Sequence, residues 1–176
     1  MEIGPVDRIT AGAVGEPGGR TFYLQARAGA TLVTLIVEKQ QVELLSASIL
    51  DILERVGKET EEGPGDEEME LEEPLEPAWR VGRLSIGYAE DRDQLMLEVE
   101  ELVPELEDEE VAEQVGTPEP HTIRLWATRA QMLALSRHGA AVAARGRPSC
   151  QFCGNPLDPE GHMCPAMNGH RELGQA

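Results

Sequence analysis

The sequence has few aromatic residues, few cysteines and few basic residues, and it has no long apolar run. Only 3% of its 176 residues are aromatic, three are cysteine, and 15 Lys and Arg stand against 33 Asp and Glu. The stretch nearest to a transmembrane pattern, Thr31–Val37, is far shorter than the roughly 20 apolar residues that a membrane-spanning helix needs. Met1–Gly12 does not combine a basic start with an apolar run, as a signal peptide does. We therefore expect a cytoplasmic protein without a membrane span.

The charge is strongly negative and unevenly distributed. The net charge is −18, and the segments Glu59–Glu76 and Glu98–Glu113 hold 10 and 9 acidic residues and no basic residue. The other 14 acidic and 15 basic residues nearly cancel. Nucleic acids and anionic membranes are themselves negative, so the net charge argues against nonspecific binding to either. The pattern predicts two acidic inserts in a nearly neutral body. The hydrophobic content of 40% is sufficient to form the core of that body.

The pattern of apolar residues predicts six strands and two helices. The expected strands share β-branched or alternating apolar residues, and they are Arg8–Val14, Arg20–Arg27, Thr31–Val37, Trp79–Ala89, Gln94–Val99 and His121–Ala127. Apolar residues spaced by three and four positions between Val42 and Val56 predict an amphipathic helix, which Gly57 ends. Thr128 and Gln131 match a capping box, which predicts that a second helix begins there and runs to Gly146.

The predicted elements follow the order strand-strand-strand-helix twice. At an offset of 90 residues, Thr31–Val37 aligns with His121–Ala127, and Gln41 aligns with Gln131. We therefore expect an α+β fold made of a tandem βββα repeat, with antiparallel sheets and two helices. The alternative is that any two strand-to-helix junctions resemble each other.

The expected domain organisation is a body followed by a small tail. The body, residues 1–148, comprises the halves 1–58 and 78–148 with acidic inserts at 59–77 and 100–119, and the tail covers residues 149–176. Residues 59–77 contain three prolines and many acids, and this composition predicts a mobile loop.

The tail carries the strongest chemical signal of the sequence. Cys150 and Cys153 form a Cys-x-x-Cys-Gly turn, and His162 and Cys164 follow with the spacing C-x2-C-x8-H-x-C. Three thiolates and an imidazole suit tetrahedral Zn²⁺, so we expect a zinc knuckle. His170 is a rival fourth ligand, although His162 needs no further loop because it stands two residues from Cys164.

Three other uses of the cysteines compete with zinc. A disulfide would leave one cysteine over and is uncommon in the cytosol. A redox pair would be expected at a strand-to-helix junction, and an iron–sulfur cluster usually takes four thiolates. Four protein ligands would close the zinc site to water, which favours a structural role. The sequence has no His-Glu-x-x-His or His-x-Glu deaminase pattern and no local Ser/His/Asp or Cys/His nucleophile arrangement, so we lean against an enzyme.

Two further groups of residues are candidate binding sites. The glycine-rich turn could hold an anion with backbone amides and nearby cations; its residues are Gly15, Gly18, Gly19 and Arg20, with Arg80 or Arg83. A tight β-turn is the plainer explanation. The acid-free stretch Pro120–Leu157 could bind RNA, with Phe152 stacking on a base, or could offset the acidic inserts; its arginines are Arg124, Arg129, Arg137, Arg145 and Arg147. His121 and His138 are expected to be surface or boundary residues.

Three stretches of the chain resemble one bacterial family. They are AGAVGEPGGRTFYLQAR, WRVGRLSIGY and GRPSCQFCGNPLDPEGHMCPAMNG, and they resemble the uncharacterised DUF3090 family, which is also described as a repeat protein. The resemblance covers nearly the whole chain. It implies a small cytoplasmic protein with Cys150, Cys153, His162 and Cys164 as the apparent ligand set, and it implies no activity.

The expected function is therefore a noncatalytic interaction or regulatory module with a structural zinc site and a protein partner. A small-molecule or phosphate-binding enzyme that uses the Gly15–Arg20 turn is one alternative. An RNA-binding accessory protein is the other.

Overall fold

The computed structural model describes residues 1–16, 18–104, 110, 113–114, 116 and 118–145, and the backbone of residues 162–163 and 171–172. Its strands are β1 (Glu2–Ile3), β2 (Arg8–Val14), β3 (Thr21–Ala28), β4 (Thr31–Val37), β5 (Val81–Ala89), β6 (Gln94–Glu101), β7 (Thr122–Thr128), β8 (His162–Met163) and β9 (Arg171–Glu172). The α-helices are α1 (Lys39–Val56) and α3 (Arg129–Ala144), and η1 (Asp66–Met69) is a short 3₁₀ helix. The α+β class is confirmed, and the strands and helices of the body lie close to their predicted positions.

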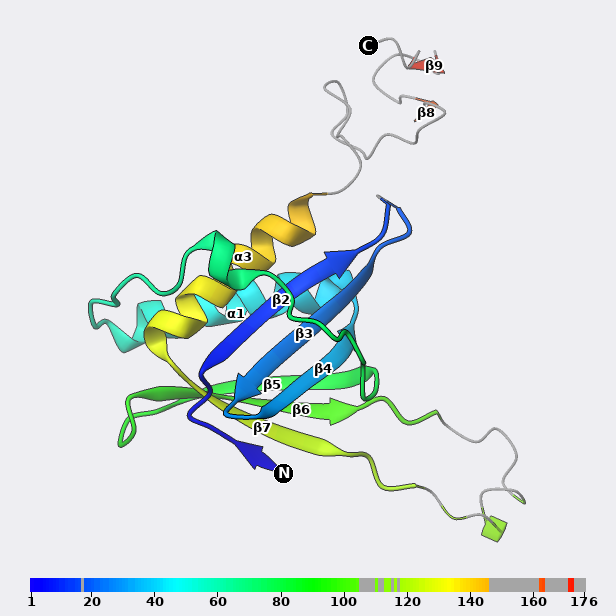
Figure 1. Ribbon diagram of the computed structural model, residues 1–176, viewed down its shortest axis with the longest axis horizontal. Coiled ribbons are helices and arrows are strands. Elements are labelled where there is room, and N and C mark those ends of the chain that lie inside the picture. Colours follow the sequence, from blue (N-terminus) through cyan, green and yellow to red (C-terminus); the bar gives the residue numbers. More distant parts are fainter. Residues whose placement is uncertain are drawn as a thin grey trace.

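Two sheets form the body (Figure 1). β2, β3 and β4 make an antiparallel three-stranded sheet, and a second sheet has the order β1-β7-β6-β5. In β6 and β7 the buried residues alternate with partly or fully exposed ones, because one face packs on the core and the other faces outward. Each sheet therefore has an inner face and an outer face.

β1 was not predicted, because two residues carry no periodicity. It pairs in parallel with β7, Glu2 opposite Arg124 and Ile3 opposite Leu125. A comparable parallel contact lies in the other sheet, where Arg80 forms a bridge with Ile36 of β4. We call β2-β3-β4 and β5-β6-β7 the two meanders. Beside the last strand of each meander lies a short segment, and this segment directly precedes the first strand of the other meander.

Both helices begin with the same side-chain device. Thr128 Oγ1 accepts from the Gln131 amide at 3.1 Å, and Gln131 Oε1 accepts from the Thr128 amide at 2.9 Å, which confirms the predicted capping box. At the start of α1, Gln41 Oε1 likewise accepts from the Glu38 amide at 2.8 Å. Gly57 ends α1 with a φ of +69°, a conformation that glycine adopts without strain.

The two helices cross at a pair of small buried residues. Ser136 Oγ of α3 donates to the Ser46 carbonyl of α1 at 2.7 Å, and both serines are buried. A Cβ at Gly139 would lie 2.9 Å from Ser46 Oγ, so glycine permits the close approach. α3 also packs on β2, and α1 packs on β5, so each helix covers the first strand of the other meander.

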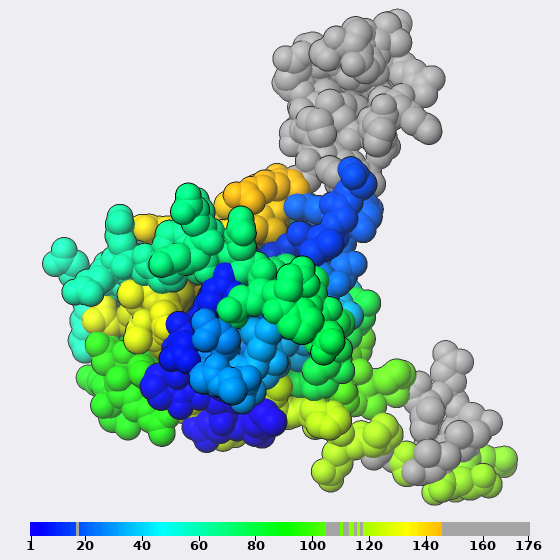
Figure 2. Space-filling view, in the orientation of Figure 1, coloured from blue at the N-terminus to red at the C-terminus, as the bar shows by residue number. Residues whose placement is uncertain are grey.

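The second part of the predicted loop at residues 59–77 packs against the body. Met69 is only 1% exposed, and the chain from 66 to 79 lies along the outer face of the three-stranded sheet (Figures 1 and 2). Its backbone bonds to sheet residues, as Ala78 N donates to Thr34 O at 2.8 Å and Ile36 N donates to Trp79 O at 3.0 Å. We call residues 66–79 the strap. Composition alone missed these long-range contacts.

Candidate functional site

The strap is held by a row of side chains on β2. Arg8 Nε donates to the Glu68 carbonyl at 2.8 Å, and Arg8 Nη2 donates to the Glu70 carbonyl. Thr10 Oγ1 donates to the Met69 carbonyl at 2.5 Å. These contacts bind the strap mainly through its backbone, and Arg8 Nη1 also lies 3.4 Å from a carboxylate oxygen of Glu72.

Gly12 completes this row. A Cβ on Gly12 would lie 2.7 Å from Cγ of Leu71, so the bare backbone forms the seat of that leucine. Arg8, Thr10 and Gly12 alternate along β2 and therefore share its outer face. The row thus has two side chains that donate hydrogen bonds to backbone carbonyls, and a glycine on which one aliphatic side chain packs.

β3 supplies further contacts to the strap. The Gln25 amide group bonds twice to the Glu72 backbone, since Nε2 donates to the Glu72 carbonyl at 3.0 Å and Oε1 accepts from the Glu72 amide at 2.7 Å. Gln25 Nε2 also donates to Thr34 Oγ1 at 3.0 Å. Arg27 Nε lies 3.1 and 3.0 Å from the two carboxylate oxygens of Glu72. The sheet face thus recognises an extended, acidic segment, and an open groove of about 820 Å³ runs beside it, lined by Asp7, Arg8, Arg27, Pro64, Leu71 and Gln131.

A second polar cluster joins the β5–β6 turn to α3. Arg129 donates to both carboxylate oxygens of Asp93 at 2.8 and 3.1 Å, and Tyr88 Oη donates to Asp93 Oδ1 at 2.6 Å. Two hydrogen bonds lower the pKa of Asp93 from 3.8 to about 2, and the one from Arg129 has a larger effect than the one from Tyr88. The hydrogen bond between Arg129 and Asp93 also raises the pKa of Arg129. Arg129 also donates to the Glu59 carbonyl and to Thr60 Oγ1, so this cluster stabilises the fold.

The residues predicted to bind an anion do not come together in one site. Gly15 and Gly18 adopt φ values of +115° and +91°, and the Gly19 amide donates to the Glu16 carbonyl at 2.9 Å, as in a tight turn. Arg20 donates to the Val142 carbonyl at 3.1 Å.

The other two predicted cations do not join that turn. Arg80 pairs with the Glu38 carboxylate at 2.6 Å. Arg83 is exposed on β5. Among the described residues, the structure shows no contact that joins Arg20 to Arg80 or Arg83.

The arginines proposed for RNA are likewise dispersed. Arg124 pairs with Glu98 at 2.9 Å, and Arg129 is the partner of Asp93. Arg137 and Arg145 are exposed on and after α3. Arg147 lies outside the described residues. Two of the four described arginines are thus neutralised by carboxylates of the same chain.

The histidines of the body differ from each other. His121 is exposed, stacks on Trp79 with ring centroids 6.4 Å apart, and lies 3.2 Å from a Glu101 oxygen. His138 is only 7% exposed, so its prediction as a surface or boundary residue is wrong. Its Nδ1 is 3.5 Å from Asp66 Oδ1 of the strap, which shows that η1 covers it.

Most of the expected zinc ligands fall outside the described part of the chain. Cys150, Cys153, Cys164 and the alternative ligand His170 all lie there. His162 belongs to β8, which pairs antiparallel with β9, and its side chain is not described. Within residues 1–16, 18–104 and 118–145, no cluster of His, Cys, Asp and Glu is placed to hold a metal ion.

Sequence reasoning missed the residues that hold the strap. Arg8, Thr10 and Gly12 have the alternation of a strand with one polar face, but their role depends on a segment some 60 positions away. Gln25 was another missed signal, because an amide in the middle of an apolar strand needs a buried partner.

Comparison with known proteins identifies a family but no individual relative. No helix within the described ranges is both long and apolar enough to traverse a bilayer. No curated protein and no solved structure matches the chain significantly. The family model described as a protein of unknown function (DUF3090) matches residues 1–164. The chain therefore belongs to the DUF3090 family.

Proposed function

We propose that this protein is a noncatalytic interaction module of the cytoplasm whose C-terminal tail binds one structural Zn²⁺. The observation that carries the interaction role is the binding of residues 68–72 by the outer face of the three-stranded sheet. Arg8, Thr10 and Gln25 read five backbone groups of that segment, and Arg27 pairs with its Glu72 side chain. A face that holds an extended chain mainly through its backbone has the chemistry of a peptide-binding surface.

The zinc site is proposed from its donor chemistry. Cys150, Cys153 and Cys164 offer three thiolates, and His162 offers an imidazole in the spacing C-x2-C-x8-H-x-C. This set fits tetrahedral Zn²⁺ and leaves no open position for a reacting water. The bound ion would tie the tail together, and the reduced thiols that it needs are usual in the cytoplasm.

We also propose that the body is a tandem βββα repeat, with halves 1–58 and 78–148, acidic inserts 59–77 and 100–119, and the zinc-binding tail at 149–176. Matching contacts at an offset of 90 residues support this. Gln41 and Gln131 each accept from the amide of the residue before their helix, and Ser46 and Ser136 meet where the helices cross. Two halves related by a pseudo-twofold axis would bring such equivalent serines together.

Zinc content of purified variants tests the metal site. The wild-type chain is expected to hold one Zn²⁺ by elemental analysis, and Cys150→Ser and His162→Ala are expected to lose it. His170→Ala should retain it, as should His121→Ala, a matched control because His121 is exposed on the body. If His170→Ala releases zinc and His162→Ala does not, His170 is the fourth ligand. Zinc-free wild-type protein under reducing conditions would refute the metal site.

Cross-linking in cells tests the interaction role. A partner that is enriched with the wild-type chain and recovered stoichiometrically would support it. Multiple-turnover activity of the purified protein towards any small-molecule substrate would contradict the noncatalytic assignment.

A further inference from the structure

β5 repeats the strap-binding row of β2. The first strand of each meander carries an arginine, a hydroxyl residue and a glycine at alternate positions, which are Arg8, Thr10 and Gly12 in β2 and Arg83, Ser85 and Gly87 in β5. The registers agree, because Arg8 lies opposite Arg27 of β3 as Arg83 lies opposite Glu100 of β6. The intervening Leu84 and Ile86 pack against the core. The row of β5 therefore belongs to the outer face of the four-stranded sheet.

The two rows differ in what covers them. Arg8 is engaged by the strap, whereas the side chains of Arg83 and Ser85 are exposed and make no hydrogen bond or ion pair with other described residues. A Cβ at Gly12 would collide with Leu71, but a Cβ at Gly87 would meet nothing within 4 Å. The same recognition elements are thus accessible on β5.

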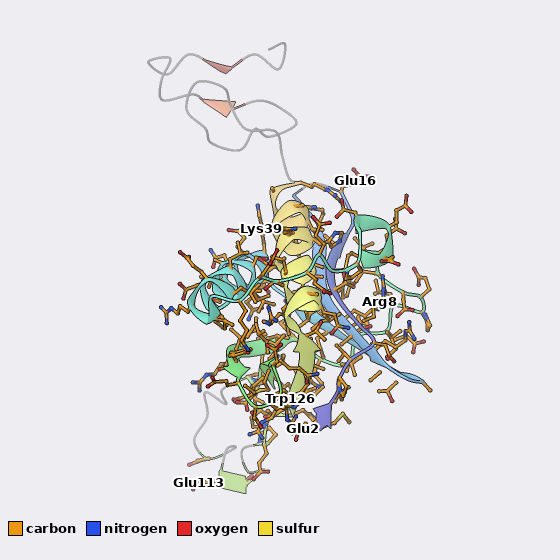
Figure 3. All side chains as sticks on the ribbon, turned by 90° about the vertical axis from the view of Figure 1, so that its left-hand side faces the viewer. Glu2, Arg8, Glu16, Lys39, Glu113 and Trp126 are labelled. Carbon is orange, nitrogen blue, oxygen red and sulfur yellow. The ribbon has the colours of Figure 1, made fainter. Side chains whose placement is uncertain are left out.

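Neighbouring contacts cover the β7 edge of this face. β1 lies along the edge of β7, where Glu2 accepts from Trp126 Nε1 at 2.6 Å and the Arg92 guanidinium stacks on the indole ring at 4.0 Å. Figure 3 shows Glu2 beside Trp126, apart from Arg8 of the other sheet. This edge corresponds to the contact of the strap end with β4, and the exposed side chains of Arg83 and Ser85 lie in the part that matches the binding site of residues 68–72.

One substitution changes the charge that this face selects. In the three-stranded sheet, Arg27 pairs at 3.0 Å with the carboxylate of Glu72, the residue that follows the seated Leu71, and Arg8 lies 3.4 Å from the same carboxylate. The corresponding position of β6 is Glu100. The position of Gln25 is taken by Glu98, whose carboxylate already pairs with Arg124 at 2.9 Å. The carboxylate of Glu100 in this place favours a cationic side chain after the aliphatic one.

We propose that the outer face of β5 and β6 binds an extended segment of a partner protein in which an aliphatic residue is followed by lysine or arginine. Arg83 donates to its backbone carbonyls, Ser85 donates to a third carbonyl, Gly87 seats the aliphatic side chain, and Glu100 pairs with the basic one. This inference deepens the proposed interaction function, on which it rests, by naming the class of partner.

Peptide titration of the full-length, isotopically labelled chain tests the site. The probes are the capped peptides Ser-Met-Ser-Leu-Lys-Ser and Ser-Met-Ser-Leu-Glu-Ser, which differ only in the charge after leucine. The lysine peptide is expected to shift the amide signals of Ser85 and Gly87 saturably and to bind about tenfold more tightly than the glutamate peptide. Saturable shifts at Gly12 without shifts at Gly87 would place the peptide on the wrong sheet and overturn the proposal.

Variants assign the contacts. Arg83→Ala is expected to weaken binding at least about tenfold, because hydrogen bonds from a charged donor are lost. Gly87→Val should abolish binding while leaving the fold intact, since its Cβ has open space. Arg137→Ala, at another exposed arginine, should change nothing. Unaltered affinity in both Arg83→Ala and Gly87→Val would overturn the site.

A charge reversal tests the selectivity separately. Glu100→Arg recreates the arrangement of Arg8 and Arg27, so it is expected to reverse the preference in favour of the glutamate peptide. An unchanged preference would overturn the assignment of Glu100. Concentration-dependent self-association that Gly87→Val abolishes would identify a second copy of the chain as the occupant and overturn the partner class. Because Cys150→Ser should leave peptide binding unchanged, failure of this site and failure of the zinc assignment are distinguishable.

Discussion

Removing the side chain that anchors the strap should open it. Met69 is 1% exposed, and in fully buried sites Met→Ala substitutions cost about 2–5 kcal/mol. The strap lies at the surface and can settle into part of the vacated volume, so we expect Met69→Ala to lower the free energy of unfolding by about 2 kcal/mol. If this loss of about 2 kcal/mol affects the local opening of the strap, the population of molecules with an open strap rises about 30-fold, since 1.4 kcal/mol corresponds to a factor of ten.

A protease that cleaves after glutamate can measure this opening, because the strap contains five glutamates between Glu67 and Glu73. When opening is fast relative to cleavage, the cleavage rate follows the opened population. Urea denaturation of the same variants gives the overall stability. Met69→Leu nearly conserves volume and should cost less than about 1.5 kcal/mol. Leu44→Ala is a control because Leu44 is 68% exposed.

The reasoning would be refuted by rapid cleavage of the wild-type strap that Met69→Ala leaves unchanged. That result is the one expected of a mobile acidic loop, as composition alone predicts for residues 59–77.

Three other perturbations have defined outcomes. The pKa of Asp93 is about 2 in the folded chain, below its ordinary value of 3.8, so the ionised carboxylate stabilises the fold above about pH 4 and this contribution is lost as the pH falls from 4 to 2. Asp93→Asn keeps a residue that tolerates the φ of +50°, and its urea stability should fall below that of the wild type at pH 7 and converge with it near pH 2; a constant difference would contradict the role of the charge. Gly139→Val drives a side chain into Ser46 and should lower the free energy of unfolding by about 1–3 kcal/mol, measured against the exposed control Ala140→Val; equal stabilities would show that the helices separate freely. Zinc chelation should unfold the tail and preserve the far-ultraviolet dichroism of the body, whereas loss of the whole signal would show that the body depends on the metal.

Local patterns predicted most of the fold. Apolar alternation located the strands of both sheets, and the Thr128–Gln131 capping box located the start of α3, because each signal lies within a few neighbouring residues. The matching box at Glu38 escaped notice, since glutamate is an unusual residue to precede a helix.

Long-range contacts could not be predicted in the same way. The strap has only three buried or partly buried aliphatic or thioether side chains, so its composition resembles that of a loop, while its stability comes from Arg8 and Gln25 on distant strands. β1 is similarly invisible, because its partner strand lies more than a hundred residues away.

The recurrence of the β2 row in β5 was hidden for a different reason. The offset of 90 residues fits the last strand and the helix of each half, but Arg8 corresponds to Arg83 at a smaller offset. The difference arises because β3 and β4 are joined by a two-residue turn, whereas a long acidic segment separates β6 from β7. One alignment without gaps cannot fit both parts.

The exchange of helices between the two meanders has a consequence for synthesis of the chain. β2 is completed early, but the helix that covers it, α3, ends only at Ala144. The inner face of the first sheet therefore stays uncovered while most of the body is still being translated. Pairings between such distant segments slow folding, because a long loop must close before the contacts can form. Neither half can complete its core on the ribosome by itself, and the body is expected to fold in one late step after the last helix emerges.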